Sequence, residues 1–449
     1  MPANSPKRNA TISRPEGEAL RLFSLSFGLL LGLSLLKFGN LCLFEELIPW
    51  PQNVFEWVLT PWPITIGYWM AGLLAVFGLL VAHPKSNAPR WVLVLPLIWL
   101  GWQFLSATQT IDRSLTQQVL PHFVVCVVCF YLGIFCLGRK SKPMVFWIPI
   151  LFAMVLVVAS GLQQHFGGLE ETRRYFFTYL YPHVDSVTPE YLKKISSDRI
   201  FATLFYPNTL AGALLILLPP TMATFWQLSE RFTFPARCFL LGSYGIAGLA
   251  CLYWSGSKGG WLLCLCTGLV AALHFRFAAR IKVILVTTLL LAGLGGFFWK
   301  YSTFFQSGAT SVHARFDYWQ AALRTALSKP VLGSGPATFG ESYKAIKRPE
   351  SEMARLAHND YLEQASDSGF PGFAAFSVWM LAIAWYAYPR RNSASGRFGL
   401  FVWLGILGWL LHGTMEFGLY IPAISWFGFG VSGWAITNSQ PLPPDKPSK

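Results

Sequence analysis

The chain has 449 residues, of which 53% are hydrophobic and only 12% are charged. Soluble domains carry roughly 25% charged residues, and a water-soluble globule has no interior large enough for this excess of apolar side chains. Because a membrane-spanning helix takes about 20 apolar residues, the apolar content is enough for about twelve spans. The composition therefore predicts a polytopic membrane protein and excludes a soluble enzyme, a disordered chain and a secreted disulfide scaffold.

Twelve apolar runs follow one another along the chain, and each is predicted to be a helix that crosses the membrane. Backbone polar groups in lipid need internal partners. The fold expected is therefore all-α: a polytopic membrane helical bundle of about 12 transmembrane helices, with a helical cap at the outer face. The runs cover residues 22–38, 63–82, 91–107, 120–138, 143–163, 204–226, 238–254, 260–274, 283–300, 372–388, 398–414 and 418–436.

Basic residues gather in alternate connections, and this pattern sets the expected orientation. With the N-terminus inside, the inner tails and connections hold nineteen Lys and Arg residues against four acids, which accounts for essentially all of the net charge of +14. Both termini are therefore expected to be cytoplasmic. The charge indicates contact with anionic membrane lipids rather than with nucleic acid. The nineteen residues are Lys7, Arg8, Arg14, Arg21, Lys85, Arg90, Arg139, Lys140, Lys142, Arg231, Arg237, Arg276, Arg280, Lys282, Arg390, Arg391, Arg397, Lys446 and Lys449.

The connections divide the chain into seven segments. Acids and bases balance in the two long outer loops, so both are expected to be folded caps. Charges within the spans are scarce: Lys37, Lys300 and Glu416 lie near span ends, where snorkelling to the interface accounts for them. In chain order the segments are a cytoplasmic tail (1–21), spans one to five (22–163), a first outer loop (164–203), spans six to nine (204–300), a large outer loop (301–371), spans ten to twelve (372–436) and a Pro-rich cytoplasmic tail (437–449).

The large outer loop contains two predicted helices. In the first, apolar residues recur at helical spacing from Val312 to Leu327, and Pro330 ends the helix. This stripe is expected to face either the membrane or the bundle, and the adjacent Arg315 either points under the cap or reaches a lipid phosphate. The second helix is predicted over Met353–Ser366 and carries His358, and the residues from Asp367 to Gly372 lead back into the membrane.

Two further polar motifs lie at the outer ends of spans. Arg199 and Asn208 flank a proline at the entrance of the sixth span, where both an arginine and a helix N-terminus favour anions. Ser257, Lys258 and Gly259 form a Gly-rich turn that opens the eighth span. That turn either holds a phosphate or simply joins two helices.

Three of these motifs, in this order, resemble those of the O-antigen ligase and O-antigen polymerase family of integral membrane glycosyltransferases, over about residues 199–385. The first is the run Arg199–Asn208, and the second is the turn Ser257-Lys258-Gly259. The third consists of Arg315 and Trp319, followed along the chain by Gly333-x-Gly335 and by His358-Asn359-x-Tyr361-Leu362. The sequence departs from the family pattern at Lys258, where the family favours Arg, at Ala202, where it favours Gly, and at Asp367, where it usually has Glu.

The resemblance implies a role for each site residue. It makes His358 the catalytic base that takes a proton from the acceptor hydroxyl. It implies that Arg199, Lys258 and Arg315 bind the substrate diphosphate as its charge develops. One of Asp360, Glu363 and Asp367 is expected to orient the imidazole, and the spacing does not choose among them. The supporting residues are expected to be Asn208, Asn359, Tyr361 and Asp367.

The resemblance also implies the reaction. An oligo- or polysaccharide is transferred from a polyprenyl diphosphate carrier to an acceptor at the periplasmic face of the bacterial inner membrane, so the outer cap is periplasmic. Family members act without a metal and invert the anomeric centre, and no cofactor is expected. The acceptor is a lipid core, as in lipopolysaccharide biosynthesis, another glycan, or a protein. The sequence does not separate a ligase from a polymerase. A transporter or flippase for a lipid-linked or sugar substrate, and a non-catalytic assembly subunit, remain alternatives.

Overall fold

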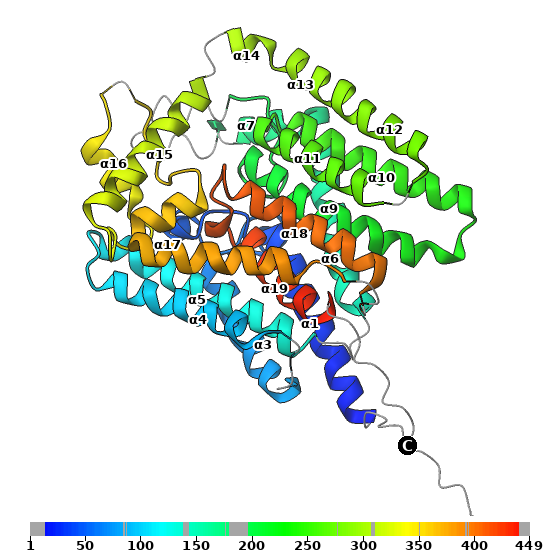
Figure 1. Ribbon diagram of the computed structural model, residues 1–449, viewed down its shortest axis with the longest axis horizontal. Helices are drawn as coiled ribbons and strands as arrows, with labels where there is room; N and C mark the ends of the chain where they lie inside the picture. Colours follow the sequence, from blue (N-terminus) through cyan, green and yellow to red (C-terminus); the bar gives the residue numbers. More distant parts are fainter. Residues whose placement is uncertain are drawn as a thin grey trace, which may run out of the picture.

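The computed structural model describes residues 14–83, 86, 88–137, 143–175, 177–178, 196–275, 277–306, 310–349, 351–390, 393 and 395–439. Within these residues the fold is helical, as predicted (Figure 1). Part of the expected topology signal and part of the first outer loop lie outside the described residues. The cations concerned are Lys7, Arg8, Lys85, Arg139, Lys140, Lys142, Arg276, Arg391, Lys446 and Lys449.

A helix coincides with each of the twelve predicted runs, but nine of the described helices are long and apolar enough to cross a membrane. Three others are a pair of shorter apolar helices, α11 (Lys258–His274) and α18 (Gly396–His412), and α19 (Pro422–Ser439). The nine are α1 (Arg14–Lys37), α3 (Ile64–Val81), α4 (Arg90–Ala107), α5 (Arg113–Phe135), α6 (Pro143–Gln163), α9 (Pro207–Leu228), α10 (Phe234–Trp254), the α12–α13 run (Ala279–Lys300) and α17 (Asp360–Tyr386).

The first and the fourth of these helices begin well before the predicted residues, because apolar composition alone does not mark a helix start. The first begins at Arg14 rather than at residue 22, so it includes charged residues of the expected tail. The fourth begins at Arg113 rather than at residue 120. There the side chain of Asp112 accepts a hydrogen bond from the Leu115 amide at 3.1 Å, and this cap fixes the first turn.

The helix α19 forms the centre of the bundle, and all its residues are buried (Figure 1). It packs most closely against α5, where glycines let the two backbones approach each other. A Cβ atom on Gly133 would lie 2.1 Å from the carbonyl oxygen of Gly430, and one on Gly433 would lie 2.1 Å from that of Phe130. Small residues of this kind are typical of helix contacts within membranes.

Helix α15 (Thr310–Ser328) forms the predicted amphipathic element above the bundle, and α16 (Phe339–Ile346) follows it. The face that packs against α17 carries small and polar residues, among them Ala322 and Ala326, which are fully buried. The apolar stripe points away, since Phe316 is 56% exposed and Leu327 is 62% exposed. Most of the stripe is therefore not packed on the bundle, although Trp319 in its middle packs against the buried cluster that includes Ala322.

The element α17 contains two helical stretches joined across a kink at Gly369, within the predicted break at residues 367–372, but the first stretch does not begin at residue 353. It starts at Asp360 because the side chain of Asn359 accepts hydrogen bonds from the amides of Tyr361 and Leu362, both at 3.0 Å. His358 therefore lies in an irregular segment before the helix and not on it. Gly369, with φ 68° and ψ −177°, kinks the helix at the expected point of entry into the membrane.

Candidate functional site

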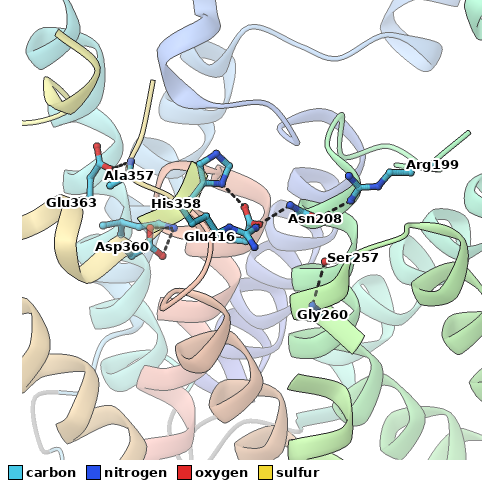
Figure 2. A network of polar contacts seen from close by, with 11 residues as sticks. Arg199, Asn208, Ser257, Gly260, Ala357, His358, Asp360, Glu363 and Glu416 are labelled. Atoms are coloured by element: carbon cyan, nitrogen blue, oxygen red, sulfur yellow. Dashed lines mark hydrogen bonds and ion pairs between the residues drawn. The ribbon is translucent and has the colours of Figure 1, made fainter. Parts of the chain in front are cut away.

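The polar motifs of the sequence meet at one end of the bundle, where several helices begin or end. Asn208 lies in the first turn of α9, and Lys258 begins α11. His358 precedes α17, and Glu416 lies in the turn that follows α18. Figure 2 shows Glu416 between His358 and Asn208, with Arg199 beyond Asn208.

The carboxylate of Glu416 joins three of these side chains. Its Oε2 atom lies 3.0 Å from Nδ1 of His358. Its Oε1 atom accepts a hydrogen bond of 2.6 Å from the side-chain nitrogen Nδ2 of Asn208. Arg315 forms an ion pair with the same Oε1. The Glu416 side chain is only 7% exposed, so these partners replace water almost completely.

The charges around Glu416 keep it ionised. Burial by itself raises the pKa of this carboxyl, but the facing His358, Arg315 and His412 outweigh burial and hold the pKa at about 2. The carboxylate is therefore negative throughout the neutral range. It can hold one tautomer of His358, the one with the proton on Nδ1, because that proton then donates to Oε2.

His358 is positioned by its backbone and by two aromatic rings. Its φ of +51° lies in the left-handed region, which non-glycine residues rarely adopt. The ring of Tyr318 stacks on the imidazole at 5.8 Å between centroids, and the Phe417 ring meets it edge-on at 4.7 Å. The side chain is 28% exposed. No described residue hydrogen-bonds its Nε2, which is thus available as a base.

Arg199 is connected to the same carboxylate through Asn208. Its guanidinium donates to the Asn208 side-chain oxygen at 2.7 Å and, through Nε, to the Ser255 carbonyl oxygen at 2.7 Å. Burial lowers the pKa of Arg199, Glu416 opposes this, and the nearby Arg315 adds to it. Glycine at position 256 leaves room for the side chain, because a Cβ there would lie 3.1 Å from Nε of Arg199.

Two lysines extend the positive region. Lys258 follows the cap residue Ser257, whose Oγ accepts from the Gly260 amide at 3.2 Å, and its Nζ lies 5.0 Å from the centroid of the Tyr301 ring. The charge of Lys258 interacts with those of Arg199 and Arg315. Lys300, which was expected to snorkel, instead donates to the Tyr253 carbonyl oxygen, and its charge interacts with those of Arg199 and Lys258.

Among the described residues, no hydrogen bond or ion pair joins His358 to any of the three acids expected to orient it, and its carboxylate partner is Glu416. The carboxylate of Asp360 accepts from the Leu419 amide at 3.1 and 3.2 Å, and that of Glu363 accepts from the Ala357 amide. The carboxylate of Asp367 accepts from the Ala337 amide at 2.7 Å. These acids fix the backbone turns around the site, and the residue that orients the imidazole is Glu416.

Sequence reasoning missed Glu416 because a charge at a span end is ordinarily explained by snorkelling. Glu416 is 58 positions from His358 in the chain, so no local spacing connects them. The available signal was its isolation as the only acid between two apolar runs, 398–414 and 418–436. Lys37, the third charge given this explanation, is also buried and donates to the carbonyl oxygens of Val58 and Thr60 at 2.5 and 2.9 Å.

The four residues expected to support the site have different positions. Asn208 lies within it, between Arg199 and Glu416. Asn359 caps α17, and the Tyr361 hydroxyl donates to the Leu410 carbonyl oxygen at 3.2 Å, which ties α17 to α18. Asp367 lies away from His358 and holds the turn that contains Ala337.

Lys258, Arg315 and His358 lie in a segment of the chain that matches a known family. The model of a family described as O-antigen ligase matches residues 244–377, which contain these three residues but neither Arg199 nor Glu416. This segment carries an O-antigen ligase domain. The resemblance stated from the sequence motifs is thereby confirmed for this part of the chain.

The match to a curated relative covers only part of each of the two proteins. The chain is 25% identical over 181 residues to an uncharacterised protein of Haemophilus influenzae. That match covers 35% of this chain and 45% of the relative, so the chain spans less than half the length of the relative. The apolar helices and the ligase domain together indicate a multi-pass membrane protein.

Proposed function

We propose that the protein is a membrane glycosyltransferase. It transfers an oligo- or polysaccharide from a polyprenyl diphosphate carrier to an acceptor hydroxyl at the periplasmic face of the inner membrane. The observation that carries the proposal is the Glu416–His358 pair beside the cations Arg199, Lys258 and Arg315. A base and several positive charges in one place match the two needs of this reaction.

In the proposed reaction, Nε2 of His358 takes the proton of the acceptor hydroxyl. Glu416 then faces an imidazolium, whose charge it stabilises through Nδ1, 3.0 Å away. The acceptor oxygen forms a bond to the anomeric carbon while the bond from that carbon to the diphosphate oxygen breaks. Because attack and departure occur on opposite faces, the anomeric configuration is inverted. The proton on His358 passes to solvent or to the departing diphosphate.

The cations act on the leaving group. Negative charge grows on the diphosphate oxygen as the glycosyl bond breaks, and fixed positive charges stabilise it in the transition state more than in the bound donor. Arg315 lies next to the base, and Arg199 and Lys258 extend away from it. The donor is already activated by its diphosphate link, so the proposed reaction needs no nucleotide.

We propose a lipid core as the acceptor, as for an O-antigen ligase, because the family model bears that description. A polymerase that transfers to another glycan unit would use the same donor and the same site. Analysis of glycans after deletion of the gene separates the two. Long polymers retained on the carrier indicate a ligase, and single repeats retained on the carrier indicate a polymerase.

The proposal is tested with membranes that contain site variants. Replacing His358 by Gln removes the base, and we expect the rate of glycan transfer to fall by about a hundred-fold or more. Glu416→Gln should also lower the rate, because the neutral amide stabilises an imidazolium poorly. His313→Gln is the matched control, since His313 is exposed on α15. Full transfer activity in His358→Gln, or transport of the donor without a new glycosidic bond, would contradict the proposal.

A further inference from the structure

Lys300 brings a fourth positive charge to the site from a helix at the edge of the bundle. The α12–α13 run lies along the outside of the bundle beside α11 (Figure 1). Only 6% of its apolar stretch is buried inside the protein. Its last residue, Lys300, turns inward. The Nζ atom lies 3.1 Å from the centroid of the Tyr253 ring, and its charge interacts with those of Arg199 and Lys258.

The cations at the Glu416 end of the site face a carboxylate, whereas Lys300 at the other end does not form an ion pair with a described residue. Glu416 pairs with Arg315 and, through Asn208, approaches Arg199. Lys300 donates to the Tyr253 carbonyl oxygen but makes no ion pair with any described residue. Its other neighbours are aromatic rings, and its charge interacts with those of Arg199 and Lys258. Cations held near one another repel, and a bound anion stabilises them.

Tyr301 provides a second, independent sign of a ligand. The residue is only 6% exposed, yet its hydroxyl has no hydrogen-bond partner among the described residues. Burial raises the pKa of this hydroxyl and the neighbouring Arg199 opposes the rise, so Tyr301 keeps its proton and remains a donor. A buried donor without an acceptor costs about 1–3 kcal/mol, and an anion at this place would remove that cost.

We propose that Lys258, Lys300 and Tyr301 form a subsite for the phosphate that is attached to the lipid of a polyprenyl diphosphate. The sugar-bearing phosphate then lies toward Arg315 and His358, and Arg199 lies between the two phosphates. The direction follows from the membrane: α12–α13 is the lipid-facing side of the site, and the polyprenyl chain must lie in lipid. This inference rests on the proposed function and extends it to the orientation of the donor.

The test measures binding without transfer, using the purified full chain in detergent and two probes that carry no sugar. Farnesyl diphosphate has both phosphates, and farnesyl monophosphate has only the lipid-attached one. We expect Lys300→Met to weaken the binding of both probes roughly ten-fold, because a charged hydrogen bond is lost. Tyr301→Phe should weaken both by several-fold. Lys300→Arg should restore most of the affinity for both.

The control is Lys282→Met, which removes the same charge from the exposed start of α12. It should leave both affinities unchanged. Arg315→Gln separates the two halves of the site: it should weaken the diphosphate and leave the monophosphate unaffected. If Lys300→Met and Tyr301→Phe bind both probes like the wild type while Arg315→Gln weakens the diphosphate, the subsite is wrong and the proposed function stands. If the wild type binds neither probe, both fail.

Discussion

Four non-glycine residues of the described chain have left-handed backbones, and all four belong to segments that build the site. They are Ala202, Phe205, Ala337 and His358, with φ between +51° and +65°. Strain of this kind costs about 1–3 kcal/mol per residue and persists only where the surroundings enforce it. Gln164 enforces it at Ala202, because its side-chain oxygen accepts from the Ala202 amide at 2.8 Å. The loop that carries Arg199 is thus held in place by hydrogen bonds to the Gln164 side chain.

The positive φ of Ala202 explains why glycine is expected at this position in the family. We predict that Ala202→Gly stabilises the protein by up to about 1 kcal/mol. Glycine avoids the left-handed strain, which costs an L-residue about 1–2 kcal/mol. It also loses more conformational entropy on folding than alanine, which offsets about 0.5–1 kcal/mol of that gain. The measurement is the thermal unfolding midpoint of the purified protein in detergent, and the midpoint should rise.

Ala271→Gly is the matched control, because Ala271 lies inside helix α11. There glycine should lower the midpoint, since it costs about 1 kcal/mol relative to alanine in a helix interior. A lower midpoint for both variants would mean that Ala202 does not have the left-handed backbone described here.

At the scale of elements, the site depends on how α17 is joined to the turn after α15. A Cβ atom on Gly369 would lie 2.3 Å from the Val331 carbonyl oxygen, and one on Gly333 would lie 2.4 Å from the carbonyl carbon of Asp367. The two glycines therefore allow the turn to lie directly on the kink of α17. This contact joins the end of α15, the helix that carries Arg315, to α17.

We predict that Gly369→Ala lowers both the stability and the rate of glycan transfer. The added methyl group meets backbone atoms, which cannot move aside as a flexible side chain can, and the residue also has a φ of +68°. Gly101→Ala on α4 is the control, because a Cβ there has nothing within 4 Å, and it should be neutral or slightly stabilising. Thermal unfolding and the transfer assay should agree; equal behaviour of the two variants would contradict the packing described.

The same elements show what the sequence could and could not predict. Apolar periodicity predicted α15 and its end near Pro330, because both are local properties. It could not show which face of α15 is buried, since small residues such as Ala322 pack as well as large ones. The start of α17 was misplaced because apolar spacing alone does not show which residue caps the helix; the cap is Asn359, a residue type favoured at helix starts.

The family motifs predicted the cations and the base of the candidate site, but no sequence pattern predicted its acid, Glu416. The roles of His358, Arg199, Lys258 and Arg315 stay proposals, while the structure brings these residues to one end of the bundle. Glu416 comes from a turn between α18 and α19, whose position depends on the packing of the whole bundle. A contact between residues so distant in the chain has no sequence pattern.

At the scale of the whole molecule, the site must face the periplasm if the topology is as expected. We predict that a membrane-impermeant thiol reagent labels Glu341→Cys on α16 in intact spheroplasts, and labels Arg280→Cys at the start of α12 only after lysis. Both positions are exposed. The experiment needs a chain whose eight native cysteines are replaced by serine. Labelling of Arg280→Cys alone in intact spheroplasts would place the site in the cytoplasm.

The most direct test of the account uses the purified protein in liposomes that contain a polyprenyl-diphosphate-linked glycan and an acceptor glycolipid. The measurement compares the polyprenyl diphosphate released with the glycosidic bonds formed, and determines the anomeric configuration of the product. We predict equal amounts of the two products, an inverted configuration, and loss of both products in His358→Gln. Glycosidic bond formation that persists in His358→Gln, or release of diphosphate without any new bond, would contradict the account.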